Sequence, residues 1–85
     1  MTESVLRDLT EEADDWARSL EAQIWAGERK LAQLTADPNG SMIEIAEELR
    51  RVKALRPALV EVRGLLAALD IRARELRAAW LRAGP

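Results

Sequence analysis

The chain of 85 residues contains no cysteine and no histidine. Without cysteine it forms no disulfide and offers no thiolate as nucleophile or ligand. Without histidine it lacks the usual general base near neutral pH and a common transition-metal ligand. Adjacent carboxylates such as Asp14-Asp15 and Glu47-Glu48 point about 100° apart on a helix and do not converge on one atom. We therefore expect no enzyme activity, no cofactor and no metal site.

The sequence also lacks long apolar runs. No stretch approaches the roughly 18 uninterrupted apolar residues of a membrane span, and the first residues lack the basic start and apolar run of a secretory signal. Apolar residues make up 48% and charged residues 33% of the chain, a composition typical of a folded domain. We expect one small domain, no membrane partner and, by default, a cytoplasmic location.

The charges are sorted along the chain. Residues 1–48 carry 12 acidic and 4 basic side chains, whereas residues 49–85 carry 3 acidic and 9 basic ones, so the halves sum to −8 and +6. The net charge of −2 conceals this division. An acidic front and a basic back attract each other, within one chain or between two copies.

Apolar residues recur every three or four positions from Leu6 to Leu34, as on one face of a helix. Thr2 or Ser4 is suited to cap this helix, and the run Asp37-Pro38-Asn39-Gly40-Ser41 consists of turn residues. Ser41 and Glu44 have the spacing of a capping box. The pattern predicts a helix over 3–35, a turn over 36–40 and a second helix over 42–82.

The second apolar stripe continues past Pro57 with its phase nearly intact. A proline inside a helix removes one hydrogen bond and costs about 3 kcal/mol. No Gly, Asn, Asp or Ser stands beside Pro57 to form a turn, so we expect a kink rather than a break. The predicted fold is an all-α antiparallel hairpin with a long second helix kinked near Pro57, self-associating into a helical bundle. A three-helix bundle is the alternative.

Folding the hairpin about Pro38-Asn39 places residue i opposite residue 77 − i. This register predicts that Glu3, Asp8 and Glu11 lie beside Arg74, Arg72 and Arg63, and that Arg29 and Lys30 lie beside Glu48 and Glu47. Such exposed pairs contribute only about 0 to 1 kcal/mol each, so burial must hold the fold together. The predicted core residues are Leu9, Trp16, Leu20, Ile24, Leu31, Leu49, Val52, Leu59, Val62 and Leu66.

The same register leaves the end of the second helix without an opposite helix. Leu76, Trp80 and Leu81 lie beyond the start of the first helix, and an exposed Trp beside two leucines forgoes a few kcal/mol of burial. We predict that Leu76, Trp80, Leu81, Trp25 and Arg77 bind a partner helix. The alternative is that Trp80 rejoins the core of its own chain.

Three segments carry a family resemblance: Ser19-Leu20-Glu21-Ala22-Gln23-Ile24, Arg29-Lys30-Leu31, and Arg51-Val52-Lys53-Ala54-Leu55 with the apolar stretch that runs on to Leu69. They resemble the small helical-hairpin chaperones of type III secretion needle subunits. This resemblance implies a cytoplasmic hairpin that joins a second chaperone and keeps an aggregation-prone helical subunit in solution. Spectrin-like repeats and designed helical bundles fit the same composition.

The expected function is a non-enzymatic interaction module that presents an apolar helix face to a helix of another protein, as an adaptor or chaperone does. One alternative is a self-associating structural bundle with no separate client. Another is weak binding of anions or nucleic acid by the arginines Arg56, Arg63, Arg74 and Arg77, with Trp80 as a stacking platform. Asp70 within this stripe and the negative net charge weigh against nucleic acid.

Overall fold

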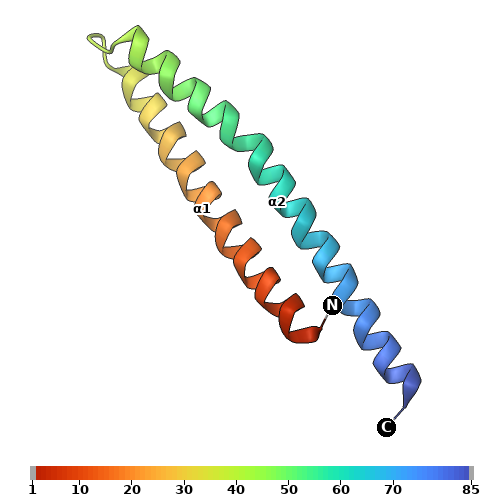
Figure 1. Ribbon diagram of the computed structural model, residues 1–85. Helices are drawn as coiled ribbons and strands as arrows, with labels where there is room; N and C mark the ends of the chain where they lie inside the picture. Colours follow the sequence, from red (N-terminus) through yellow and green to blue (C-terminus); the bar gives the residue numbers. More distant parts are fainter. Residues whose placement is uncertain (1, 85) are drawn as a thin grey trace.

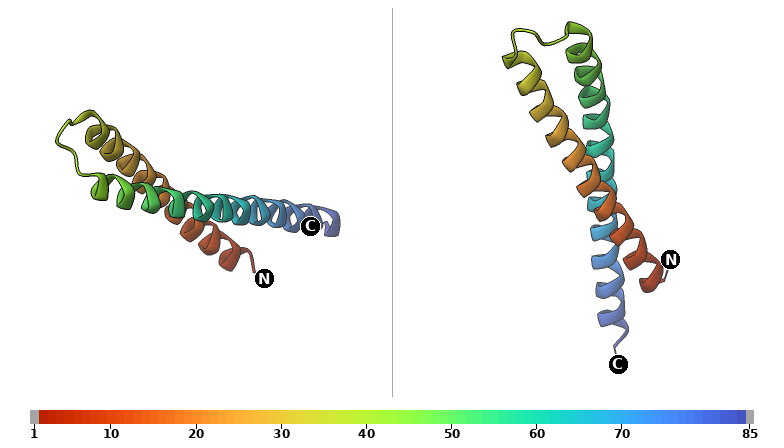
Figure 2. Two further views of the ribbon diagram at one scale, coloured as in Figure 1. Left: turned by 90° about the horizontal axis from the view of Figure 1, so that it is seen from above. Right: turned by 90° about the vertical axis from the view of Figure 1, so that its left-hand side faces the viewer.

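The computed structural model describes residues 2–84 and shows a hairpin of two long antiparallel helices (Figure 1). Helix α1 spans Glu3–Ala36 and helix α2 spans Met42–Ala83. The hairpin is a rod of 69 × 16 × 14 Å, and its two helices cross at a shallow angle (Figure 2). The predicted all-α hairpin is confirmed, with both helices ending one residue later than expected.

Side-chain caps fix where each helix begins. The Thr2 hydroxyl accepts a hydrogen bond of 3.2 Å from the Val5 amide, and the Ser41 hydroxyl accepts one of 3.4 Å from the Glu44 amide. Each bond satisfies one of the amides that a helix start leaves without an intrahelical partner. The two caps therefore explain why α1 starts at Glu3 and α2 at Met42.

The turn between the helices is held by Asp37. Its carboxylate accepts a 2.9 Å hydrogen bond from the Asn39 amide, and its carbonyl accepts one of 2.9 Å from the Gly40 amide. A Cβ atom at Gly40 would collide with the carbonyl oxygen of Leu34. Glycine is therefore required here by close approach of the backbone, which makes the reversal tight.

Helix α2 runs through Pro57 without interruption. Figure 1 shows α2 as one continuous, gently curved helix, so the three-helix alternative is wrong. Pro57 and Lys53, whose carbonyl would accept from the amide that proline lacks, are both exposed, so this carbonyl is on a side of α2 that water can reach.

The core is one strip between the two helices. Its buried apolar residues are Leu6, Ala13, Ala17, Leu20, Ile24, Val52, Leu59, Val62 and Leu69. Of the ten predicted core residues, five are in this strip and two, Leu31 and Leu66, pack partly buried against it. The alanines Ala13 and Ala17 were not among the predictions, and they let the helices approach closely.

Three core predictions are wrong, because Leu9, Trp16 and Leu49 are 39%, 56% and 42% exposed. Each satisfies the three-or-four spacing of its helix, but each lies to one side of the line along which α1 and α2 touch. A single opposing helix covers only a narrow strip. The side chains flanking that strip are therefore left in solvent.

The register also differs from the predicted one. Lys30 lies 3.6 Å from Glu48, one position from the predicted Glu47, and Arg63 pairs with Glu21 rather than Glu11. The arginines expected to meet Glu3 and Asp8 instead pair within α2: Arg74 with Asp70 and Arg72 with Glu75. The 77 − i rule ignores how each helix is rotated about its own axis. The observed partner of Glu21, Arg63, is seven positions from residue 56, which the rule predicts.

Gly27 marks a close approach of the two helices. A Cβ atom there would lie 2.5 Å from Cγ2 of Val52 and 3.0 Å from Oε1 of Glu48. Val52 is buried and β-branched, so its side chain has little freedom to move aside. Glycine in the middle of a helix lowers stability by about 1 kcal/mol relative to alanine. At Gly27 the missing side chain leaves room for Val52 to pack against the backbone of α1.

We predict opposite effects of alanine at two helical glycines. Gly27→Ala should lower the free energy of unfolding by about 1 to 3 kcal/mol because the new methyl group overpacks the strip. Gly64→Ala should raise it by up to about 1 kcal/mol, because a Cβ atom at Gly64 has no neighbour within 4 Å. Urea unfolding of both variants measures the two changes, and stabilisation by both would contradict the close approach.

Candidate interaction surface

One face of the hairpin carries an exposed apolar patch, which we call the Trp16 face. Leu9 and Trp16 of α1 and Leu65 of α2 line a shallow hollow there, with the buried Ala13 and Leu69 beneath them. Trp16 is 56% and Leu65 47% exposed. Glu12 is the one charged side chain that lines the hollow. This surface is suited to contact apolar side chains of another helix.

The opposite face, here called the ion-paired face, is bridged by charges. Arg56 Nη2 lies 2.5 Å from Glu28 Oε1, and Arg63 Nη2 lies 2.9 Å from Glu21 Oε1. All four side chains are about half exposed, so each pair contributes at most about 1 kcal/mol to stability. Their larger effect is to line this face with charge, which leaves it solvated.

Helix geometry places the two surfaces on opposite sides. Trp16 and Glu21 are five residues apart and so lie about 140° apart around α1, with the buried Ala17 and Leu20 between them. In α2, Arg56 and Leu65 are nine residues apart, which is half a turn around the axis, about 180°. Each helix therefore sends one side to the Trp16 face and the other to the ion-paired face.

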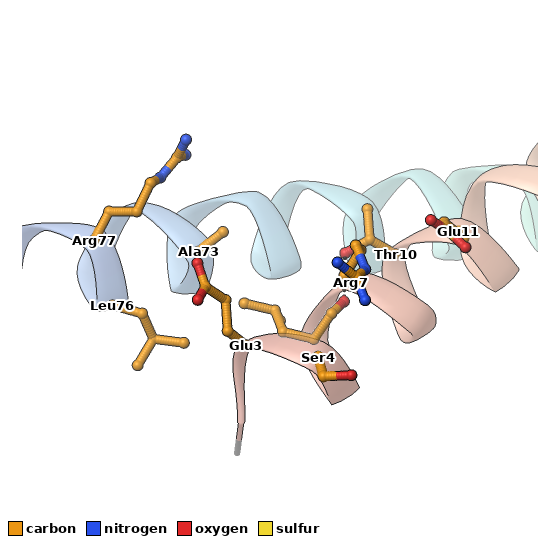
Figure 3. Close-up of a pocket in the computed structure, with 9 residues that line it drawn as sticks. Glu3, Ser4, Arg7, Thr10, Glu11, Ala73, Leu76 and Arg77 are labelled. Carbon is orange, nitrogen blue, oxygen red and sulfur yellow. Dashed lines mark hydrogen bonds between the residues drawn. The ribbon is translucent and has the colours of Figure 1, made fainter. Parts of the chain in front are cut away.

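A second groove, of about 520 Å³, lies at the open end of the hairpin (Figure 3). Leu6, Ala73 and Leu76 give it an apolar floor, and charged side chains stand at its rim. The close-up shows that Arg7 and Arg77 come from different helices and do not converge on one point. Glu3 and Glu11 line the same groove, so it has no net positive character that selects an anion.

Of the predicted partner-binding residues, Trp80 and Leu81 lie beyond the hairpin contact. They are 72% and 71% exposed, so Trp80 does not rejoin the core of its own chain. Leu76 differs from the expectation, because it is partly buried against the core and lines the open-end groove with Leu6. The unsupported end of α2 is therefore shorter than the sequence predicted.

Of the other two predicted partner-binding residues, only Trp25 lies apart from that end. Trp25 is 63% exposed, and the guanidinium of Arg29 stacks 5.3 Å from its ring centroid. It lines a groove on the ion-paired face together with Val60. Arg77 is exposed at the open end of the hairpin, where it lines a groove with Leu76 and Trp80. The structure thus brings these three predicted residues together and leaves Trp25 apart.

The arginine stripe proposed for nucleic acid is largely engaged within the chain. Arg56, Arg63 and Arg74 pair with Glu28, Glu21 and Asp70 respectively. A phosphate group would have to compete with these carboxylates for each guanidinium. This surface offers alternating charges rather than a positive groove.

Sequence reasoning missed the Trp16 face because it assigned Leu9 and Trp16 to the core. A partial signal was present, since Leu9 and Trp16 lie seven residues apart beside the buried positions of α1, and Ala58 and Leu65 do so in α2. The next residues of the same heptads, Gln23 and Arg72, are polar, so the sequence marks only a short apolar widening of the stripe.

Comparison with protein-family models, with curated proteins and with solved structures finds no match for this chain. The resemblance to needle-subunit chaperones therefore stays a prediction. Within residues 2–84, neither helix is long and apolar enough to cross a bilayer. In that same part of the chain no three acidic side chains gather as a metal-binding group.

We predict that the end of α2 can be removed without unfolding the hairpin. Truncation after Ala78 deletes Trp80 and Leu81 and retains Leu76 against α1, so the free energy of unfolding should change by less than about 0.5 to 1 kcal/mol. Chemical unfolding of the truncated and full chains measures the difference. A loss of several kcal/mol would show that Trp80 supports the fold.

Proposed function

We propose that this chain is a non-enzymatic interaction module, half of a helical bundle that is completed by helices of another chain. The observation that carries the proposal is the Trp16 face. Its three large apolar side chains, Leu9, Trp16 and Leu65, lie in solvent over a hollow between two antiparallel helices. A helix laid along such a hollow covers apolar surface on both helices at once.

The thinness of the hairpin core supports this proposal. Large apolar residues remain exposed along the whole rod: Val5, Leu9, Trp16, Trp25, Met42, Ile43, Leu49, Val60, Leu65, Ile71, Trp80 and Leu81. A buried Trp removes roughly 200 Å² from water, worth a few kcal/mol. A stability gain of that size is available only through contact with another chain.

The alternatives have less support. Binding of anions or nucleic acid requires unpaired positive charge, whereas three of the four stripe arginines are ion-paired within the chain. A chaperone-like role, in which the chain binds a helical client, is compatible with an apolar helical face. The client itself is suggested only by the family resemblance. Self-association is the second candidate, and the charge and shape of the Trp16 face favour it.

A pair of matched variants tests the proposal. Trp16→Glu places a charge on the Trp16 face, and Trp25→Glu places the same charge on the ion-paired face; both tryptophans are more than half exposed, so the hairpin folds in both. We expect the wild-type chain to migrate above its own mass of 9.5 kDa in native extract. Trp16→Glu should reduce it to a single chain, because burying an unpaired carboxylate costs several kcal/mol.

The measurement is native mass in cell extract and after purification, with helix content from circular dichroism as the folding control. Trp25→Glu should leave the assembly intact. A wild-type chain that has the mass of one chain in both preparations would contradict the proposal, as would equal loss of assembly in both variants.

A further inference from the structure

We infer that the Trp16 face is covered by a second copy of the chain, aligned so that α1 of each copy packs on α2 of the other. This inference rests on the proposed function and specifies its partner. The resulting assembly is a closed four-helix bundle with a two-fold axis parallel to the rods, in which every helix has antiparallel neighbours.

The shape of the Trp16 face is self-complementary in this orientation. The α1 side of the hollow carries the bulky Leu9 and Trp16, whereas the α2 side carries Leu65 and, seven residues before it, the smaller and partly buried Ala58. Trp16 and Leu65 line the same hollow, so they lie at the same level of the rod. Rotation about an axis parallel to the rods places Trp16 of each copy on Leu65 of the other, large side chain against smaller one.

The charges favour the same orientation. Helix α1 carries 8 acidic and 4 basic side chains, and α2 carries 6 acidic and 9 basic ones, so the helices sum to −4 and +3. Aligned copies place each acidic α1 beside a basic α2. Copies that run in opposite directions place α1 on α1 and α2 on α2, which brings like charges together. Electrostatics therefore selects the aligned bundle.

The available area is sufficient for a dimer. Helix α1 has 34 residues and is about 50 Å long, and the hairpin is 16 Å across. The footprint of one face is thus about 800 Å², which is what each partner buries in a standard specific interface. The face needs no partner larger than the chain itself.

The cysteine-free sequence permits a direct test by disulfide trapping. Gln23 lies seven residues after Trp16, and Ala58 seven residues before Leu65, so both are on the Trp16 face at one level. In aligned copies, Gln23 of one chain faces Ala58 of the other; in reversed copies it faces Leu9. Single-cysteine variants are mixed in a redox buffer in two test pairs, Gln23→Cys with Ala58→Cys and Gln23→Cys with Leu9→Cys. A third mixture, Trp25→Cys with Val60→Cys, is the control on the ion-paired face.

We expect the Gln23→Cys and Ala58→Cys mixture to form predominantly the mixed disulfide, and the other two mixtures to stay reduced. Preferred linkage of Gln23→Cys with Leu9→Cys would overturn the aligned orientation. If the wild-type chain sediments as a monomer over a roughly hundredfold concentration range, the Trp16 face is not covered by a second copy. If the chain is nevertheless part of a larger assembly in extract, the proposed function stands with a different partner.

Discussion

Two helices packed side by side cover only one narrow strip of each other, and the rest of this structure depends on that constraint. Small residues at Ala13, Ala17 and Gly27 let α1 and α2 approach closely, which strengthens the strip but also narrows it. Side chains only 60 to 80° away from the contact line, such as Trp16, are then left in solvent. The hairpin therefore holds together and leaves large apolar side chains in solvent.

Both faces keep large apolar side chains in solvent, but on the ion-paired face Trp25 and Val60 stand among charged side chains. Glu21 and Glu28 meet Arg63 and Arg56 across the ion-paired face, and these half-exposed pairs are better solvated than buried. On the Trp16 side, Lys30 reaches Glu48 near the turn, whereas the hollow at Trp16 is lined by a single charged side chain, Glu12. Sorting of acidic residues to α1 and basic residues to α2 places opposite charges side by side in the hairpin, and in the proposed dimer it would specify which helix of the other copy each helix accepts.

The hairpin was predictable from the sequence because its signals are local. Heptad spacing, the caps at Thr2 and Ser41, and the Asp37–Ser41 turn each act over a few residues. The surface was not predictable in the same way. Whether Trp16 is core or surface depends on how many helices surround it, and periodicity gives the direction of a side chain without the number of its neighbours. The register failed for a related reason, since it depends on the rotation of both helices.

Quenching of Trp16 fluorescence tests the central claim most directly. With Trp25→Phe and Trp80→Phe, Trp16 is the only fluorophore in a chain without tyrosine, and acrylamide reports its exposure. We expect Trp16 to be shielded at high protein concentration and to become accessible on dilution as the bundle dissociates. A matched chain that retains only Trp25 should be quenched strongly throughout. Equal quenching of both tryptophans at every concentration would contradict the account.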